Sequence, residues 1–116
     1  MTSNKKNITA KEIAIRFNEL AQQEKWFEIQ DEFFSDTVTS RDPRDSPYLG
    51  YAEGKVAVHK KGKDFVKEIT AVHKAYTSEP VVGGNYFSVA REIDITHQKF
   101  GRMQINQIML YEVKDG

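Results

Sequence analysis

Residues 79–96 read EPVVGGNYFSVAREIDIT, and residues 101–116 read GRMQINQIMLYEVKDG. Both stretches are rich in β-branched and aromatic residues and alternate apolar with polar side chains, which is typical of strands. Turn-forming residues lie within the first stretch, at 83–85, and between the two stretches, at 97–101. The sequence therefore predicts an antiparallel meander of three strands. Their expected bounds are 74–82, 86–96 and 102–113.

Helices are expected before these strands. Thr9, followed three residues later by Glu12, has the spacing of a capping box, and apolar residues recur at helical intervals from residue 10 to about 23. A second, shorter helix is predicted over 26–34 and a third over 55–72. Because no helix separates the last three strands, a parallel sheet is excluded and the fold class is α+β.

The chain between the second and third helices is predicted to form a short strand over 37–41 and a long loop over 42–54. The loop sequence DPRDSPYLGYAEG contains two prolines and two glycines, which disfavour regular structure. Loops of this kind often cover a site. In the third helix, Gly62 lowers helix stability by about 1 kcal/mol relative to alanine, so a close contact or a kink is expected there.

Composition limits the classes of function. The 116 residues suit one domain over 1–116, with residues 1–8 expected as a flexible N-terminus. Seventeen basic residues balance seventeen acidic ones, so no global field favours nucleic acid as a partner. The N-terminus has no apolar run typical of a signal or membrane segment, and we expect a cytoplasmic protein without membrane association. There is no cysteine, and the three histidines lack metal-ligand spacing, so no metal or other cofactor is expected.

The two quoted stretches, the helical pair before them and the EGKVAV segment at 53–58 together resemble small bacterial SnoaL-like proteins of the NTF2-like superfamily. The resemblance covers nearly the whole chain. It implies a cone-shaped fold in which three N-terminal helices pack on a curved antiparallel sheet. The superfamily includes polyketide cyclases, ketosteroid isomerase, dehydratases and transport factors, so the resemblance implies a fold and no single activity. The family pattern usually continues with a further strand, so an open sheet edge is expected.

Pairing the last two strands through the 97–101 turn places residues opposite one another when their numbers sum to about 198. Arg91 and Gln107 then face each other on the core side of the sheet, which the resemblance implies lines a cavity. A buried arginine needs an acceptor, such as a ligand carboxylate, water or an internal acid like Glu68. A place at the cavity mouth, or on the outer face after a register slip, is the alternative.

The expected ligand-binding residues are side chains around this cavity and in the loop over it: Trp26, Tyr48, Tyr51, Phe65, Phe87, Arg91, Gln107 and Met109. The catalytic candidates are Asp42 and Arg91. Asp42, which precedes Pro43, resembles an aspartate common near the pocket of SnoaL-like proteins, and it could act as a general base if apolar walls raised its pKa. Turn chemistry explains the same pair of residues.

The opposite sheet face is predicted to carry two kinds of side chain. Glu92 and Asp94 are close enough to share a cation, but an ion pair between one of them and Arg102 across the hairpin explains them as well. Apolar surface at Ala90, Ile108 and Leu110 would be exposed in a monomer, so a homodimer is expected.

The sequence therefore favours a domain that binds a small hydrophobic or weakly anionic molecule between sheet and helices. One alternative is a cofactor-free acid–base enzyme of the polyketide cyclase, isomerase or dehydratase type. The other is a protein-interaction domain that uses its sheet face. The residues expected to be almost fully buried in the core are Phe17, Leu20, Phe33, Phe65, Ile69, Val89 and Ile93.

Overall fold

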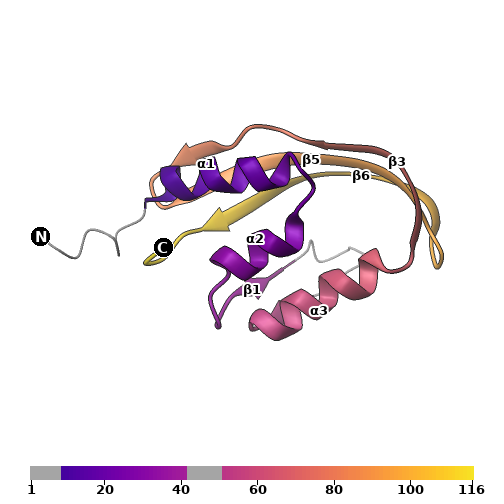
Figure 1. The fold of residues 1–116 in the computed structure, drawn as a ribbon, viewed down its shortest axis with the longest axis horizontal. Coiled ribbons are helices and arrows are strands. Elements are labelled where there is room, and N and C mark those ends of the chain that lie inside the picture. Colours follow the sequence, from indigo (N-terminus) through magenta and orange to yellow (C-terminus); the bar gives the residue numbers. More distant parts are fainter. Residues whose placement is uncertain (1–8, 42–50) are drawn as a thin grey trace, which may run out of the picture.

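Long strands curve over three helices in the computed structural model, which describes residues 9–41 and 51–116 (Figure 1). The helices are α1 (Ala10–Ala21), α2 (Trp26–Phe33) and α3 (Lys55–Val66). The strands are β1 (Thr39–Ser40), β2 (Ala52–Glu53), β3 (Ile69–Thr77), β4 (Val81–Gly83), β5 (Tyr86–His97) and β6 (Gly101–Glu112). The fold is the predicted α+β arrangement of helices packed on an antiparallel sheet.

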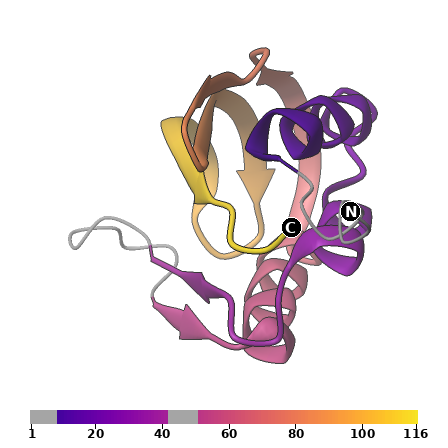
Figure 2. The ribbon, with the colours of Figure 1, turned by 90° about the vertical axis from the view of Figure 1, so that its left-hand side faces the viewer.

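Strand β5 organises the main sheet. It pairs along its whole length with β6, and it also pairs with β3 and β4, always antiparallel. In the β5–β6 pair, Phe87 lies opposite Tyr111 and Arg91 lies opposite Gln107, so the predicted register is confirmed. The short strands β1 and β2 form a separate two-stranded sheet beside α3 (Figure 2).

The first helix begins as the sequence predicts. The Thr9 hydroxyl oxygen accepts from the Glu12 amide at 3.1 Å, and the Glu12 carboxylate accepts from the Thr9 amide at 3.1 Å. This capping box satisfies two amides that the first helical turn leaves without helical partners.

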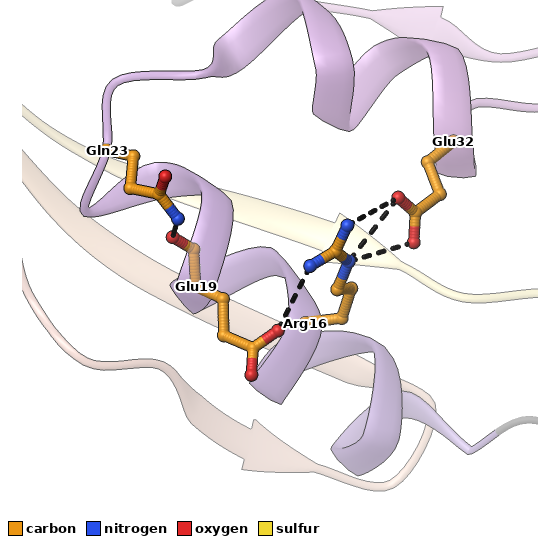
Figure 3. Close-up of polar contacts among 4 residues, drawn as sticks. All are labelled: Arg16, Glu19, Gln23 and Glu32. Carbon is orange, nitrogen blue, oxygen red and sulfur yellow. Dashed lines mark hydrogen bonds and ion pairs between the residues drawn. The ribbon is translucent and has the colours of Figure 1, made fainter.

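Charged side chains fasten the first helix to the second. Arg16 of α1 donates to Glu32 of α2, with Nε 3.2 Å from Oε2, and to Glu19 one turn along α1 at 3.2 Å (Figure 3). Gln23 donates to the backbone oxygen of Glu19 at 2.9 Å, which closes the end of α1. These groups are exposed, so they orient the helix pair more than they stabilise the fold.

Close packing explains the glycine in α3. A Cβ added at Gly62 would lie 3.2 Å from Cε1 of Phe27, on the facing side of α2. Of the two expected explanations, the structure has the close contact, because the helix runs through residue 62 without interruption.

Three of the predicted elements need correction. The third helix ends at Val66 rather than at residue 72, because the β-branched segment from Ile69 onward already pairs with β5. The strand predicted over 74–82 is two strands, β3 and β4, because Pro80 has no N–H with which to continue the ladder. The short strand predicted over 37–41 keeps only two residues, and its partner β2 lies within the predicted loop. The rest of that loop, 42–50, and the predicted flexible N-terminus, 1–8, lie outside the described residues.

The best-buried core lies between α1 and the end of the sheet formed by Phe87 and Val89. The ring of Phe17 meets the rings of Phe87 and Tyr111 at centroid distances of 5.1 and 5.0 Å. Phe17, Leu20 and Val89 are nearly fully buried, as predicted. The prediction of full burial was wrong for residues that are only partly buried, namely Phe33, Phe65, Ile69 and Ile93.

Candidate functional site

The inner face of the sheet, which the helices cover, is buried at its two ends and accessible in the middle. At one end, Phe17 of α1 packs on Phe87. At the other end, Phe65 of α3 packs on His97, with ring centroids 4.7 Å apart. Between these contacts lie three residues that we call the central band: Ile93 and Ile105, which are half-buried, and Gln107, which is exposed.

The geometry of the strands makes this band a single surface. Ile93 of β5 lies directly opposite Ile105 of β6, and Gln107 lies two residues beyond Ile105 on β6. All three side chains therefore point to the same side of the sheet. Apolar side chains left partly accessible on the helix-covered side of a sheet are what a site for a small apolar molecule requires.

Arg91 borders the central band, and its guanidinium is hydrogen-bonded to other side chains of the chain. Its guanidinium donates to both carboxylate oxygens of Glu24 at 3.0 and 2.8 Å and to the Thr77 hydroxyl at 3.0 Å. The guanidinium carbon also lies 4.7 Å from the centre of the Trp26 ring. An internal acid, one of the kinds of acceptor that were expected, thus binds Arg91, and this acid is Glu24 rather than Glu68.

The carboxylate of Glu24 is held in its charged form by these contacts. Partial burial favours the neutral acid, but hydrogen bonds from Arg91 and from the Trp26 indole outweigh it, so the pKa of Glu24 is lowered. Glu24 lies in the turn between α1 and α2, where its φ of 58° is unusual for a residue other than glycine. Sequence reasoning missed Glu24, because neither its spacing nor its neighbours place it near residue 91.

Two further polar groups on the inner side were also missed. His97 is 2% exposed; its Nδ1 accepts from the Lys99 amide at 3.1 Å, while its Nε2 has no hydrogen-bond partner in the described part of the chain. The Oε1 atom of Gln30 on α2 is also buried without a partner among the described residues. Strand alternation could have placed His97 on the inner face, because it has the same parity as Arg91.

The predicted ligand-binding residues do not all converge on the central band. Phe87 is packed in the core, with its ring stacked on Tyr111 at 5.1 Å. Tyr51 is 53% exposed, and the guanidinium carbon of Arg41 lies 5.3 Å from the centre of its ring. Gln107 belongs to the band.

The remaining candidates are divided between the site and the undescribed loop. Met109 is half-buried next to Gln107 on the inner face, and its sulfur lies 3.7 Å from the Tyr111 hydroxyl. Burial raises the pKa of Tyr111 well above its usual range, so this hydroxyl keeps its proton. Asp42 and Tyr48 lie outside the described residues.

The outer sheet face carries ion pairs. Arg102 donates to both oxygens of Asp94 at 3.0 and 2.9 Å, as expected, and this contact lowers the pKa of Asp94. Lys74 meets Glu92 at 2.8 Å. Within residues 9–41 and 51–116 the structure has no cluster of three or more side chains of metal-binding type. None of the helices described is long and apolar enough to cross a membrane.

Comparisons with known proteins agree with this architecture. The family model of the SnoaL-like domain matches residues 8–116. A crystal structure of a candidate SnoaL-like polyketide cyclase (carbohydrate phosphatase) from Mesorhizobium loti is similar, with a TM-score of 0.86 and 27% sequence identity; the match covers 94% of this chain and 92% of that one. No curated protein matches the sequence significantly. With helices on a curved antiparallel sheet and a family model that spans almost the whole chain, this protein belongs to the SnoaL-like domain family, within the NTF2-like superfamily.

Proposed function

We propose that this domain binds a small, uncharged, mainly apolar molecule on the central band, between the sheet and the helices. The observation that carries the proposal is the burial of the inner face, which is nearly complete at both ends and incomplete at Ile93, Ile105 and Gln107. When an apolar ligand covers such a surface, the free energy of binding becomes more favourable by about 25 cal/mol for each Å² of apolar area removed from water.

The contacts of Arg91 favour a neutral ligand over an anionic one. Because Glu24 neutralises the guanidinium at two points, an incoming carboxylate would have to displace a carboxylate already in place. A ligand without charge avoids that exchange. The proposal therefore keeps the apolar part of the sequence-based expectation and omits the anionic part.

Binding is favoured over acid–base catalysis by the state of the carboxyl groups. The Mesorhizobium protein is named as a candidate cyclase, and acid–base chemistry of that kind uses a carboxyl or histidine with a suitably placed pKa. In the described part of the chain, every carboxyl with a resolved shift has a lowered pKa, because a hydrogen-bonding partner stabilises its charge. Asp42 stays a catalytic candidate by its sequence alone.

Two substitutions at neighbouring positions test the proposed site. Gln107 lies on the inner face and Asn106 on the outer face, and both are exposed. A tryptophan at Gln107 should fill the space over the band, whereas a tryptophan at Asn106 should leave it free. With the neutral fluorescent probe N-phenyl-1-naphthylamine, we expect Gln107→Trp to weaken binding by about tenfold or more, equivalent to ~1.4 kcal/mol.

The matched variant Asn106→Trp should bind the probe as the wild type does. Equal binding by all three proteins, or a loss confined to Asn106→Trp, would place the probe elsewhere and contradict the proposal. Thermal unfolding of each variant shows whether the substitution has disturbed the fold.

A second role is favoured by the outer face. Ile108 and Leu110 are 71% and 68% exposed, and Val81, on the other side of β5, is 71% exposed. We propose that a second copy of the chain covers this surface, because the ion pairs beside it are satisfied within each chain and a symmetric contact can bury the same apolar residues on both copies.

A further inference from the structure

Strand β6 forms one edge of the main sheet. It pairs with β5 along its whole length, and none of the described strands lies on its other side (Figure 2). The backbone N–H and C=O groups of an edge strand that point away from the sheet have no ladder partners. Along its twelve residues β6 therefore offers a row of backbone donors and acceptors to another strand.

The opposite side of the sheet is protected in ways that β6 is not. Proteins guard sheet edges with bulges, lysine side chains and short strands. Strand β3 shifts its register against β5 twice and carries Lys74, and β4 has only three residues. Strand β6 keeps an unbroken register with β5, and residues 103–111 contain neither a charged residue nor a proline. A long, regular and uncharged edge of this kind is a site where another strand can add to the sheet.

A second copy of β6 is one strand that can add there symmetrically. Two copies related by a two-fold axis perpendicular to the sheet run antiparallel, and their inner faces lie on the same side. The inner side chains of β6 have odd numbers, so two residues can be opposite only if both numbers are odd or both are even. The axis must therefore pass through a residue of β6 rather than between two residues.

The register centred on Gln107 matches side chains of the same kind on the inner face. It places Gln107 opposite its own copy, where the two amides can hydrogen-bond. The other inner pairs join apolar side chains, Ile105 with Met109 and Met103 with Tyr111. This register pairs residues 102–112 of both copies, which is almost the whole strand.

The charges at the two ends of the strand favour the same register. It places Arg102 opposite Glu112 of the second copy, and these side chains are 62% and 44% exposed. Arg102 donates to Asp94 through Nε and Nη2, so Nη1 can donate to the second copy. Moving the axis by one residue in either direction would place Arg102 opposite Leu110 or opposite Lys114. The first loses the ion pair, and the second sets two positive charges against each other.

The exposed apolar side chains of β6 also fit a strand at this edge. Within the sheet, Ile108 and Leu110 lie opposite Ala90 and Ser88 of β5, whose short side chains cannot cover them. A strand added to the other side of β6 gives them neighbours there. In the register centred on Gln107, the two copies of Ile108 are diagonal neighbours across the axis, within reach of each other.

We propose that two copies of the chain join edge to edge through β6, antiparallel and centred on Gln107, so that one sheet runs through both. The inference rests on the assembly with a second copy proposed above and states its geometry. The second copy reaches Ile108 and Leu110 along the edge of the sheet.

The absence of cysteine from the sequence allows a direct test with single cysteine substitutions. In Gln107→Cys the two copies of residue 107 would be opposite each other, with Cα atoms about 4.5–5.5 Å apart, which suits a disulfide. Gln104→Cys is the matched control, because residue 104 is also an exposed glutamine of β6. Its two copies would be six residues apart along the strands, about 20 Å, which is too far.

Under mild oxidation of dilute protein, Gln107→Cys should form the covalent dimer at least about tenfold faster than Gln104→Cys, because its two thiols are held together in the dimer. Asn106→Cys and Ile108→Cys report the neighbouring registers, whose axes pass through those residues. Fastest cross-linking at 106 or 108, or equal rates at 104 and 107, would overturn the proposed geometry.

A charge substitution tests the same contact without a disulfide. Glu112→Lys sets a positive charge opposite Arg102 at both ends of the paired strands, so the dimer should dissociate roughly tenfold more readily. Glu79→Lys is the matched control, since it changes the net charge equally in an exposed position between β3 and β4. Its dissociation constant should stay within about twofold of the wild type. Equal weakening by the two variants in sedimentation would contradict the ion pairs.

The outcomes separate this inference from the proposed assembly. A wild-type dimer in light scattering, combined with no preference for cross-linking at 107, would mean that the copies meet elsewhere: the edge contact is wrong and the assembly stands. A monomeric wild type would make both wrong. Preferential cross-linking at 107 together with weakening by Glu112→Lys alone supports both.

Discussion

The guanidinium of Arg91 and the carboxylate of Glu24, 67 residues apart in the chain, form a two-point ion pair that joins the inner face of the sheet to the turn between α1 and α2. Arg91 contributes a side chain that is only 12% exposed, whereas that of Glu24 is 45% exposed. The pair therefore fastens to the interior a partly accessible turn, in which Glu24 has a positive φ of 58°.

The ion pair should make stability depend on pH in the acid range. The folded-state pKa of Glu24 is lowered, so its contribution to stability is complete above the pKa of the unfolded chain, about 4, and is lost as pH falls through the lower folded value. Glu24→Gln should therefore be less stable than the wild type at neutral pH, and the difference should shrink below about pH 4. Urea unfolding between pH 2.5 and 7 measures it.

A double substitution provides the control for this pH dependence. In an Arg91→Met background the carboxylate has lost its main partner, so adding Glu24→Gln should change the pH profile little. A pH-dependent difference of unchanged size in that background would show that Arg91 is not its source.

Removing Arg91 itself should destabilise the fold. Arg91→Met abolishes the contacts with Glu24 and Thr77, and we expect a loss of stability of roughly 1.5–3 kcal/mol, the range for hydrogen bonds to charged groups. Arg102→Met is the matched comparison, because Arg102 also forms a two-point pair but is 62% exposed. Arg102→Met should therefore lose less stability than Arg91→Met. Chemical unfolding of both variants tests the order, and an Arg91→Met protein as stable as the wild type would contradict the structural role.

The contact between α2 and α3 should limit what residue 62 can be. Gly62→Ala gains up to about 1 kcal/mol of helix propensity but places a methyl group 3.2 Å from Phe27, so we expect a net change within about 1 kcal/mol of zero. Gly62→Val adds bulk that Phe27 cannot avoid and should cost roughly 1–3 kcal/mol. The gap between the two variants in thermal unfolding reports the closeness of the helices; equal stabilities would mean that α2 moves freely.

Assembly through the outer face has a direct test. Light scattering at micromolar concentration should give the mass of a dimer for the wild type. The double variant Ile108→Lys with Leu110→Lys should give a monomer, because it places charges in the proposed contact. Val56→Lys, on α3 and 85% exposed, is the matched control and should stay dimeric. A monomeric wild type would end the proposal.

The parts of the fold that sequence could predict are those set by local rules. The capping box at Thr9 and the alternation along β5 and β6 act between near neighbours, so helix start, strand faces and register followed from spacing alone. The end of α3 was misplaced because Ile69 fits a helical stripe as well as it fits a strand, and only pairing with β5 decides. The acceptor of Arg91 could not be identified from the sequence for the same reason: Glu24 reaches Arg91 only through the packing of α1 and α2 on the sheet.

The candidate site was predicted less well than the fold. Gln107 was placed on the inner face by parity, but Phe87, on that face too, is buried under Phe17. Whether a side chain on the inner face is covered or accessible depends on where each helix ends and on which aromatic side chain that helix places over the sheet. That information is spread over α1 and α3 and is absent from the strand itself.

The central position of β5 has a consequence for how the sheet opens. Its backbone groups are bonded to β6 on one side and to β3 or β4 on the other, whereas β3 and β6 each pair with β5 alone among the described strands. Fraying from either side can expose half of the amides of an outer strand without disturbing the ladder on the far side of β5. Every ladder of this sheet involves β5, whereas β3 and β6 each have one side without a partner among the described strands, so the slowest-exchanging amides should be most numerous in β5.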